Sequence, residues 1–225
     1  MASRSDIIKL VRLGKELGIT LIPQFNLLGH ASASRFISFK HAVLEFKPQL
    51  ESLFEPEGWS WCLTNPETRR VITDIVDELY EVFDSPPFFH IGCDEADNLG
   101  VCAACRKKPL SQLVRDHITY FHDHLKKKKC RTIMWHDMLL RSDDLRWDGY
   151  IVCGQPSQHL DDLVGELPHD MIIADWQYGY PKHNNREPEW PTMKFFKNEG
   201  FHVLACPWYD NAGIKSLGAN VEKEG

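Results

Sequence analysis

The stretch Phe88-Phe89-His90-Ile91-Gly92-Cys93-Asp94-Glu95 decides the fold. Its first half is a short apolar run typical of a buried strand, and its second half places two adjacent carboxylates where that strand ends. Parallel α/β folds keep their chemistry at the carboxyl ends of the strands. Neighbouring strand residues point to opposite faces, so Asp94 and Glu95 can share a pocket only if the chain leaves the strand at Gly92.

The acidic pair has two interpretations. Two carboxylates in a pocket that is poor in water can acquire different pKa values, so that one is ionised while the other donates a proton near neutral pH. Alternatively, Asp94 or Glu95 caps the helix that follows. The spacing of the two residues leaves both interpretations open.

Helical and strand-like segments alternate on both sides of this stretch. Residues 5–17 carry apolar side chains at helical spacing, end at Gly18 and precede a predicted strand over 19–22. Asn65 before Pro66 predicts the N-cap and first turn of a helix that leads into the acidic strand. The pattern further predicts helices over 110–128 and 191–198 and strands over 132–135, 150–152, 171–174 and 202–205. Such alternation indicates a parallel sheet.

Polar and aromatic side chains follow almost every predicted strand. They are Gln24, Asn26 and His30, then His90, Asp94 and Glu95, then Trp135, His136 and Asp137, then Asp175, Trp176 and Tyr178, and finally Trp208, Tyr209, Asp210 and Asn211. Convergence at strand ends is the layout of the active face of a (β/α)8 TIM barrel. Indole rings beside carboxylates suit a sugar, because its C–H face packs on Trp while its hydroxyls need polar partners.

The composition is that of one globular domain over residues 1–225, with 43% hydrophobic and 26% charged residues. A formal net charge of −6 argues against nucleic acid as the main partner. No apolar stretch reaches the roughly 18 residues that a membrane span needs, and no secretory signal is visible, so no membrane partner is expected. Seven cysteines are an odd number and a sparse set, which favours a reducing, cytoplasmic location.

The segment His90-Ile91-Gly92-Cys93-Asp94-Glu95 resembles the His-x-Gly-x-Asp-Glu signature of the family 20 glycoside hydrolases, the β-N-acetylhexosaminidases. Residues 18–30 are similar to the third barrel strand of that family with its Asp-x-Pro-Gly-His ending. Residues 133–137 resemble the fifth strand, and residues 204–211 resemble the seventh. The resemblance implies a catalytic (β/α)8 barrel of which this chain carries strands three to seven, and therefore an incomplete barrel.

The resemblance also implies an activity: a glycosidase that hydrolyses terminal, non-reducing, β-linked N-acetylhexosamine with retention, assisted by the substrate. The 2-acetamido oxygen of the sugar attacks the anomeric carbon. Asp94 orients the acetamido N–H, and Glu95 protonates the leaving oxygen and then activates water. The implied substrate-binding residues are His30, His90, Trp135, Asp137, Trp176, Trp208, Tyr209 and Asn211. The substrate would be a glycan or glycoside that contains GlcNAc or GalNAc, and no cofactor is expected.

The sequence departs from the family pattern in two ways: one affects the residues around the acidic pair, and the other affects the number of barrel strands. Asn26 and Leu28 stand where the family usually has Asp and Pro. The first two barrel strands, one of which normally supplies an arginine, and the eighth strand have no counterpart in this sequence. An open barrel exposes sheet edges, so we expect the chain alone to be poorly stable or to need its missing segments or an oligomeric partner.

Two other functions fit the same residues. A truncated, inactive relative would at best bind amino sugars. A metal-dependent hydrolase on a similar barrel would use strand-end His and Asp side chains as ligands, namely His90, Asp94, His136 and Asp137.

The segment Cys102-Ala103-Ala104-Cys105 supplies half of a tetrahedral zinc site. Cys62 or a distant His could complete such a site, but no second pair stands at zinc-ribbon spacing. Plain loop cysteines, with no bound metal, are therefore the default expectation.

Overall fold

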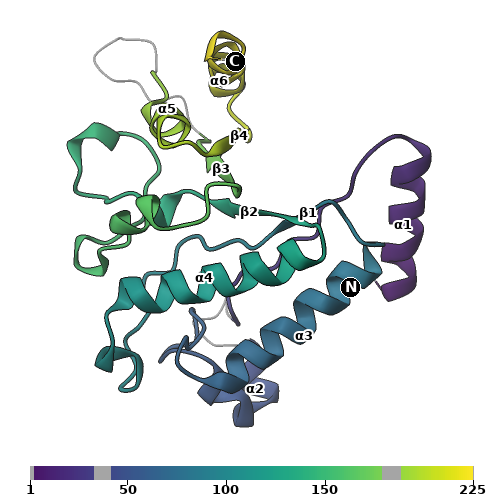
Figure 1. Ribbon diagram of the computed structural model, residues 1–225, viewed down its shortest axis with the longest axis vertical. Coiled ribbons are helices and arrows are strands. Elements are labelled where there is room, and N and C mark those ends of the chain that lie inside the picture. The colour runs from purple at the N-terminus through teal and green to yellow at the C-terminus, as the bar shows by residue number, and fades with distance from the viewer. Residues whose placement is uncertain (1–2, 33–41, 179–188, 225) are drawn as a thin grey trace.

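The computed structural model describes residues 3–32, 42–178 and 189–224 (Figure 1). At its centre lies a four-stranded parallel sheet in the order β1-β2-β3-β4. The strands are β1 Phe88–His90, β2 Arg131–Trp135, β3 Ile172–Trp176 and β4 His202–Cys206. Because all four strands are parallel, their carboxyl ends lie along one edge of the sheet.

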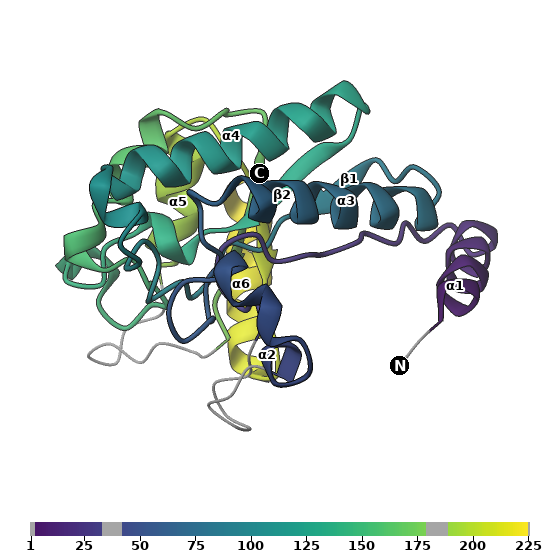
Figure 2. The same cartoon turned by 90° about the horizontal axis from the view of Figure 1, so that it is seen from below.

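Six α-helices surround this sheet in the described residues. They are α1 Arg4–Glu16, α2 Ala42–Phe46, α3 Pro66–Val82, α4 Leu110–Lys127, α5 Pro191–Asn198 and α6 Asn211–Glu224. α3 and α4 lie next to each other on one side of the sheet, and α1 lies at one end, where its Arg4 forms an ion pair with Glu78 of α3 at 3.2 Å (Figures 1 and 2). None of the described helices is long and apolar enough to cross a membrane.

Local sequence explains where the central helices begin and what they bury. Asn65 caps α3 by accepting a hydrogen bond from the backbone N–H of Glu67 at 2.9 Å, and Pro66 fills the first helical position. α3 buries Ile72 and Val76, and α4 buries one stripe of side chains, namely Val114, Ile118, Phe121 and Leu125. These side chains belong to one continuous core together with Phe89 of β1, Met134 of β2 and Ile173 of β3.

The expected strand over residues 19–22 is wrong. Pairing with β1 starts only at Pro23, whose carbonyl accepts from His90 N–H at 2.9 Å, and Gln24 forms an isolated parallel bridge with His90. Continued backwards, this register would need N–H donors at positions 23 and 86, and both are prolines, Pro23 and Pro86; Pro87 faces β2 instead, where its carbonyl accepts from Arg131 N–H at 2.9 Å. Since proline has no N–H to donate, a strand ladder cannot extend there.

The expected strand over residues 150–152 is also wrong, because side chains bind its central backbone groups. The N–H of Ile151 donates to Gln177 Oε1 at 2.8 Å, and its carbonyl lies 2.9 Å from His136 Nε2. Both groups are therefore unavailable for a ladder. The other predicted strands and the predicted helices are present within one or two residues of their expected ends.

The sheet is part of a (β/α)8 barrel rather than a closed one. A complete barrel has eight strands, and the described residues form four. Apolar side chains are exposed at both ends of the sheet: Leu13 of α1 is 48% exposed, Leu17 directly after α1 is 64% exposed, and Leu204 of β4 is 45% exposed. This pattern matches the expected incomplete barrel.

Candidate active site

The acidic pair lies in a strained turn directly after β1. Gly92, Cys93 and Glu95 all have positive φ, at 65°, 74° and 47°. Left-handed residues break the alternation of a strand and turn neighbouring side chains toward one side. A Cβ on Gly92 would lie 2.6 Å from Asn26 Cγ, so only glycine fits there. No side chain of the pair caps a helix: the N-cap of α4 is Pro109, which rules out the capping interpretation.

His30 brings the two carboxylates together. Its Nε2 lies 3.2 Å from Asp94 Oδ2 and 3.4 Å from Glu95 Oε2, and its ring centroid is 4.3 Å from that of Trp59. The side chains of His30, Asp94 and Glu95 are 38%, 18% and 29% exposed. The pair is thus partly shielded from water but still open to a ligand.

Asn26 supports the pair with an amide where the family usually has a carboxylate. Its Nδ2 donates to Asp94 Oδ1, and its Oδ1 accepts from the N–H groups of Cys93 at 3.0 Å and Leu28 at 3.3 Å. An amide donates to an ionised carboxylate, which an ionised aspartate at position 26 could not do. The departure from the family pattern therefore places a hydrogen-bond donor beside Asp94.

Asp137 holds the backbone of Glu95 from below. Its Oδ2 accepts from the N–H of Glu95 and its Oδ1 from the indole N–H of Trp176, both at 3.0 Å. The carboxylate is fully buried, and this burial raises its pKa above the usual Asp range. Asp137 can therefore position the acidic pair without touching a ligand.

His90 lies beneath the pair as a neutral side chain. Its Nδ1 accepts from Gly92 N–H at 3.0 Å, so its proton is on Nε2. Burial lowers its pKa to about 4, although the charge of Asp94 acts in the opposite direction. The ring centroid is 4.3 Å from that of Trp135, which fixes both rings below the strand ends.

A series of aromatic rings runs from this buried support to the surface. The ring centroid of Tyr178 is 4.9 Å from that of Trp176 and 4.8 Å from that of Trp208, which in turn is 4.9 Å from that of Tyr209. Trp208 and Tyr209 are 64% and 71% exposed. Asn211, the first residue of α6, is also exposed.

Two residues near the pair were not among the expected site residues. Tyr178 packs between Trp176 and Trp208, and burial, followed by the charge of Asp94, raises its pKa. Its signal in the sequence was its position two residues after Trp176 at a strand end, because such residues share a face. The indole N–H of Trp59 donates to the backbone carbonyl of Glu95 at 2.5 Å, and no local pattern indicated this contact.

The ligand set expected for a metal-dependent hydrolase is not assembled. His136 is fully buried, and its Nε2 lies 2.9 Å from the Ile151 carbonyl and 3.3 Å from Asp175 Oδ1. Both oxygens of Asp137 already accept hydrogen bonds. Within residues 3–32, 42–178 and 189–224, the one group of side chains that could hold a metal ion is Glu55, Cys62, Cys102 and Cys105.

This geometry is typical of one class of protein, the glycoside hydrolases. Their active sites place a pair of carboxylates, often beside indole rings, at the strand ends of a parallel barrel. The family model for the glycosyl hydrolase family 20 catalytic domain matches residues 1–213. The chain belongs to this family.

The comparisons with individual proteins agree with this membership. The chain is 28% identical over 148 residues to a beta-hexosaminidase of Porphyromonas gingivalis, a match that covers 61% of this chain and 19% of that protein. The fold is similar to that of a β-N-acetylhexosaminidase from Bacteroides fragilis, with a TM-score of 0.61, 19% identity and coverage of 91% of this chain and 36% of that one.

Two other solved structures extend the likeness. A chitobiase from Flavobacterium johnsoniae gives a TM-score of 0.61 at 17% identity, over 91% of this chain and 28% of that one. Dispersin B gives 0.55 at 18% identity, over 90% of this chain and 52% of that one. At these identities the likeness shows the fold, that of a TIM-barrel catalytic domain. The chain spans about half or less of the length of each relative.

Proposed function

We propose that the protein carrying this domain is a β-N-acetylhexosaminidase. It would remove terminal, non-reducing, β-linked GlcNAc or GalNAc from glycans or glycosides with retention of configuration. The observation that carries the proposal is the convergence of Asp94 and Glu95 on one imidazole, His30, at 3.2 and 3.4 Å. The name of the P. gingivalis relative supports the same class of substrate.

In this mechanism the two carboxylates have different tasks. Asp94, which accepts from the Asn26 amide, orients the acetamido N–H so that the acetamido oxygen attacks the anomeric carbon. Glu95 protonates the glycosidic oxygen and then takes a proton from water as the oxazoline-type intermediate opens. Asp137 and Trp59 hold the backbone of Glu95 on both sides, through its N–H and its carbonyl.

The aromatic rings account for selectivity towards 2-acetamido sugars. Trp135, Trp176 and Trp208 would enclose the acetamido methyl group, and Tyr209 would donate to its oxygen. A site built to bind this group leaves polar groups unpaired when a plain glucoside binds, which costs a large factor in kcat/KM. His90, with its Nε2 proton, would contact a sugar hydroxyl.

The test uses the full-length protein and aryl β-N-acetylglucosaminides with good and poor leaving groups. Glu95→Gln should lower kcat by about 10²–10⁴-fold for poor leaving groups and much less for good ones, because only poor leaving groups need a proton. Glu199→Gln, an exposed glutamate after α5, is the matched control and should leave both rates unchanged. Aryl β-glucosides should not be hydrolysed.

Two outcomes would contradict the proposal. Equal losses for good and poor leaving groups would remove Glu95 from the role of acid. Absence of turnover, with retained binding of N-acetylglucosamine in calorimetry, would favour the second candidate, an inactive relative that only binds amino sugars. The corresponding GalNAc substrates, tested in parallel, show which sugar is preferred.

A further inference from the structure

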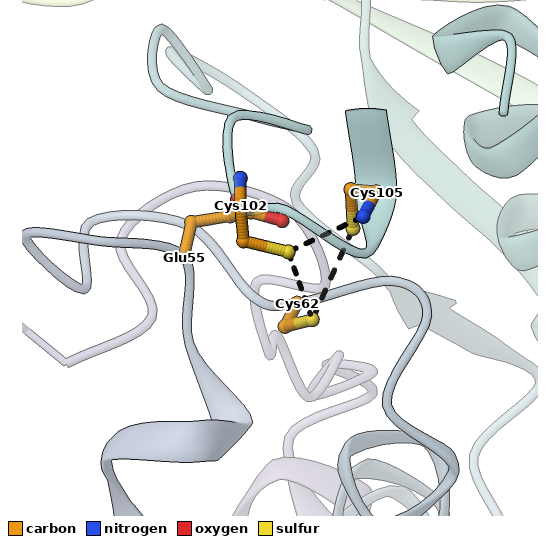
Figure 3. Close-up of side chains that lie close together, drawn as sticks. All are labelled: Glu55, Cys62, Cys102 and Cys105. Carbon is orange, nitrogen blue, oxygen red and sulfur yellow. Dashed lines mark hydrogen bonds between the residues drawn. The ribbon is translucent and has the colours of Figure 1, made fainter. Parts of the chain in front are cut away.

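Three cysteines and a buried glutamate from two distant segments meet beside the acidic site (Figure 3). Glu55 and Cys62 come from the long connection that precedes α3, whereas Cys102 and Cys105 come from the loop that follows the acidic pair. One ligand atom from each residue lies within 4.8 Å of all the others. None of the four takes part in the mechanism above.

The spacing of the sulfur atoms is that of a tetrahedral metal site. Cys62 Sγ lies 3.7 Å from Cys102 Sγ and 3.9 Å from Cys105 Sγ. Zn–S bonds of about 2.3 Å in a tetrahedron set two sulfur atoms about 3.8 Å apart. A disulfide would bring them to about 2.0 Å, and all three cysteines are free.

Glu55 provides independent support for a cation at this place. It is only 2% exposed, and its Oε2 accepts from the N–H of Cys102 at 2.5 Å. Its Oε1 is buried and has no hydrogen-bond partner among the residues that the structure describes. A buried carboxylate is costly unless it is paired or coordinates a metal, and Oε1 is free to do so.

Neighbouring groups are arranged to support sulfur ligands. The N–H of Cys105 donates to Cys102 Sγ at 3.3 Å, and the Thr64 hydroxyl lies 3.3 Å from Cys105 Sγ and 3.5 Å from Cys62 Sγ. Hydrogen bonds to sulfur stabilise thiolates and orient metal ligands. Three cations, Arg106, Lys107 and Lys108, follow the last cysteine directly and partly offset the charge of four anionic ligands.

We propose that Glu55, Cys62, Cys102 and Cys105 bind one zinc ion in a structural site. Thiolates select zinc over hard cations such as magnesium and calcium, and four protein ligands leave no position open for catalysis.

The zinc ion would also restrict the movement of the loop that carries Asp94 and Glu95. Residues 55–62 form a tight turn in which Glu55 N–H donates to the Ser60 carbonyl at 2.9 Å and Gly58 N–H to the Glu55 carbonyl at 2.7 Å. This turn presents Trp59, whose indole donates to the carbonyl of Glu95. A metal ion that ties both ends of the turn to the loop after the acidic pair would therefore fix one wall of the active site.

The full-length protein is purified in reducing buffer without chelator, and its metal content is measured by inductively coupled plasma mass spectrometry. We expect one zinc ion per chain. Exchange for Co²⁺ should produce the near-ultraviolet charge-transfer absorption of tetrahedral cobalt thiolates. Cys62→Ser and Cys102→Ser should each weaken zinc binding more than about tenfold, since even a residue that only orients a ligand is worth about 10–100-fold. Cys130→Ser, a buried cysteine outside the group, is the control and should keep the zinc.

The zinc content and the cobalt spectrum of the wild-type protein test the proposal even where a variant fails to fold. Zinc far below one per chain together with no cobalt–thiolate band would overturn the proposal, and so would a disulfide between any two of the three cysteines in peptide mapping. A chelator should lower the melting temperature of the wild type and leave that of Cys62→Ser unchanged. These readouts do not depend on hydrolysis, so they stand or fall separately from the proposed activity.

Discussion

Replacing Asp137 tests whether one buried carboxylate holds the acidic pair in place. Asp137→Ala removes the acceptors of two buried donors, the N–H of Glu95 and the indole N–H of Trp176, each at 3.0 Å. An orphaned buried donor costs about 1–3 kcal/mol, so the two together predict a loss of about 2–6 kcal/mol in the free energy of unfolding. Asp137→Asn keeps one acceptor oxygen and the side-chain volume, and should lose about half as much.

Activity should fall along with stability, because Asp137 binds the backbone of Glu95, the residue that we propose donates the proton. We expect kcat of both variants to drop more than about tenfold with a smaller change in KM, since a displaced acid acts mainly in the transition state. Urea unfolding and steady-state hydrolysis of an aryl substrate measure the two effects. Asp143→Asn is the control: this exposed carboxylate forms an ion pair with Arg141 at the surface, where such pairs contribute little to stability.

The reasoning fails if Asp137→Ala unfolds at the urea midpoint of the wild type and keeps its kcat. The pH dependence provides a second check. Because burial raises the folded-state pKa of Asp137, its contribution to stability is complete below the ordinary value of 3.8 and is lost as the pH rises through the raised pKa. The stability difference between wild type and Asp137→Asn should therefore be largest in acid and shrink toward neutral pH; a difference that grows with pH would contradict the assignment.

Three further changes probe the surroundings of the pair. Asn26→Ala removes the donor to Asp94 and the acceptor of the Cys93 and Leu28 N–H groups, so kcat should fall more than about tenfold; a kcat equal to that of the wild type would argue against the contact. Trp59→Phe removes the donor to the Glu95 carbonyl, so the free energy of unfolding in urea should fall by about 1 kcal/mol and kcat should fall as well. Full activity of this variant would show that the hydrogen bond does not position Glu95. His90 has a folded-state pKa of about 4, so it contributes stability that is present above pH 6.5 and lost as the pH falls toward 4. In His90→Gln, the free energy of unfolding from urea titrations should therefore fall less between pH 6.5 and 4 than in the wild type; an equal fall in both proteins would exclude this contribution of His90.

Local signals in the sequence located the helices and most strands, and their failures have a physical cause. The N-cap at Asn65 and the proline at position 66 fixed the start of α3 to the residue. Residues 19–22 carry an equally good strand pattern, but a ladder needs N–H donors on both strands, and Pro23 and Pro86 lack them at the positions that would pair. An apolar run cannot reveal which backbone it will face, so strand pairing had to come from the structure.

In the candidate site, too, the sequence predicted residues that form a local pattern and missed contacts between distant segments. The sequence identified Asp94 and Glu95 because adjacent carboxylates at a strand end form a local pattern. It could not identify Trp59 as a partner of Glu95, 36 residues away, nor bring Cys62 to Cys102, 40 residues away, since neither contact has a local signature. The Cys-x-x-Cys segment looked like half a site because its other ligands lie before α3 rather than at zinc-ribbon spacing.

The geometry of the acidic pair depends on these distant partners. Positive φ values at Cys93 and Glu95 cost about 1–3 kcal/mol each, or about 2–6 kcal/mol together. Three hydrogen bonds hold the same backbone, from Cys93 to Asn26, from Glu95 to Asp137 and from Trp59 to Glu95. At about 1.5–3 kcal/mol for the bond to a charged group and about 1 kcal/mol for each neutral one, they contribute about 3.5–5 kcal/mol and offset the strain with little to spare. Loss of any one should therefore let the turn relax, and the two carboxylates would separate before the barrel itself unfolds.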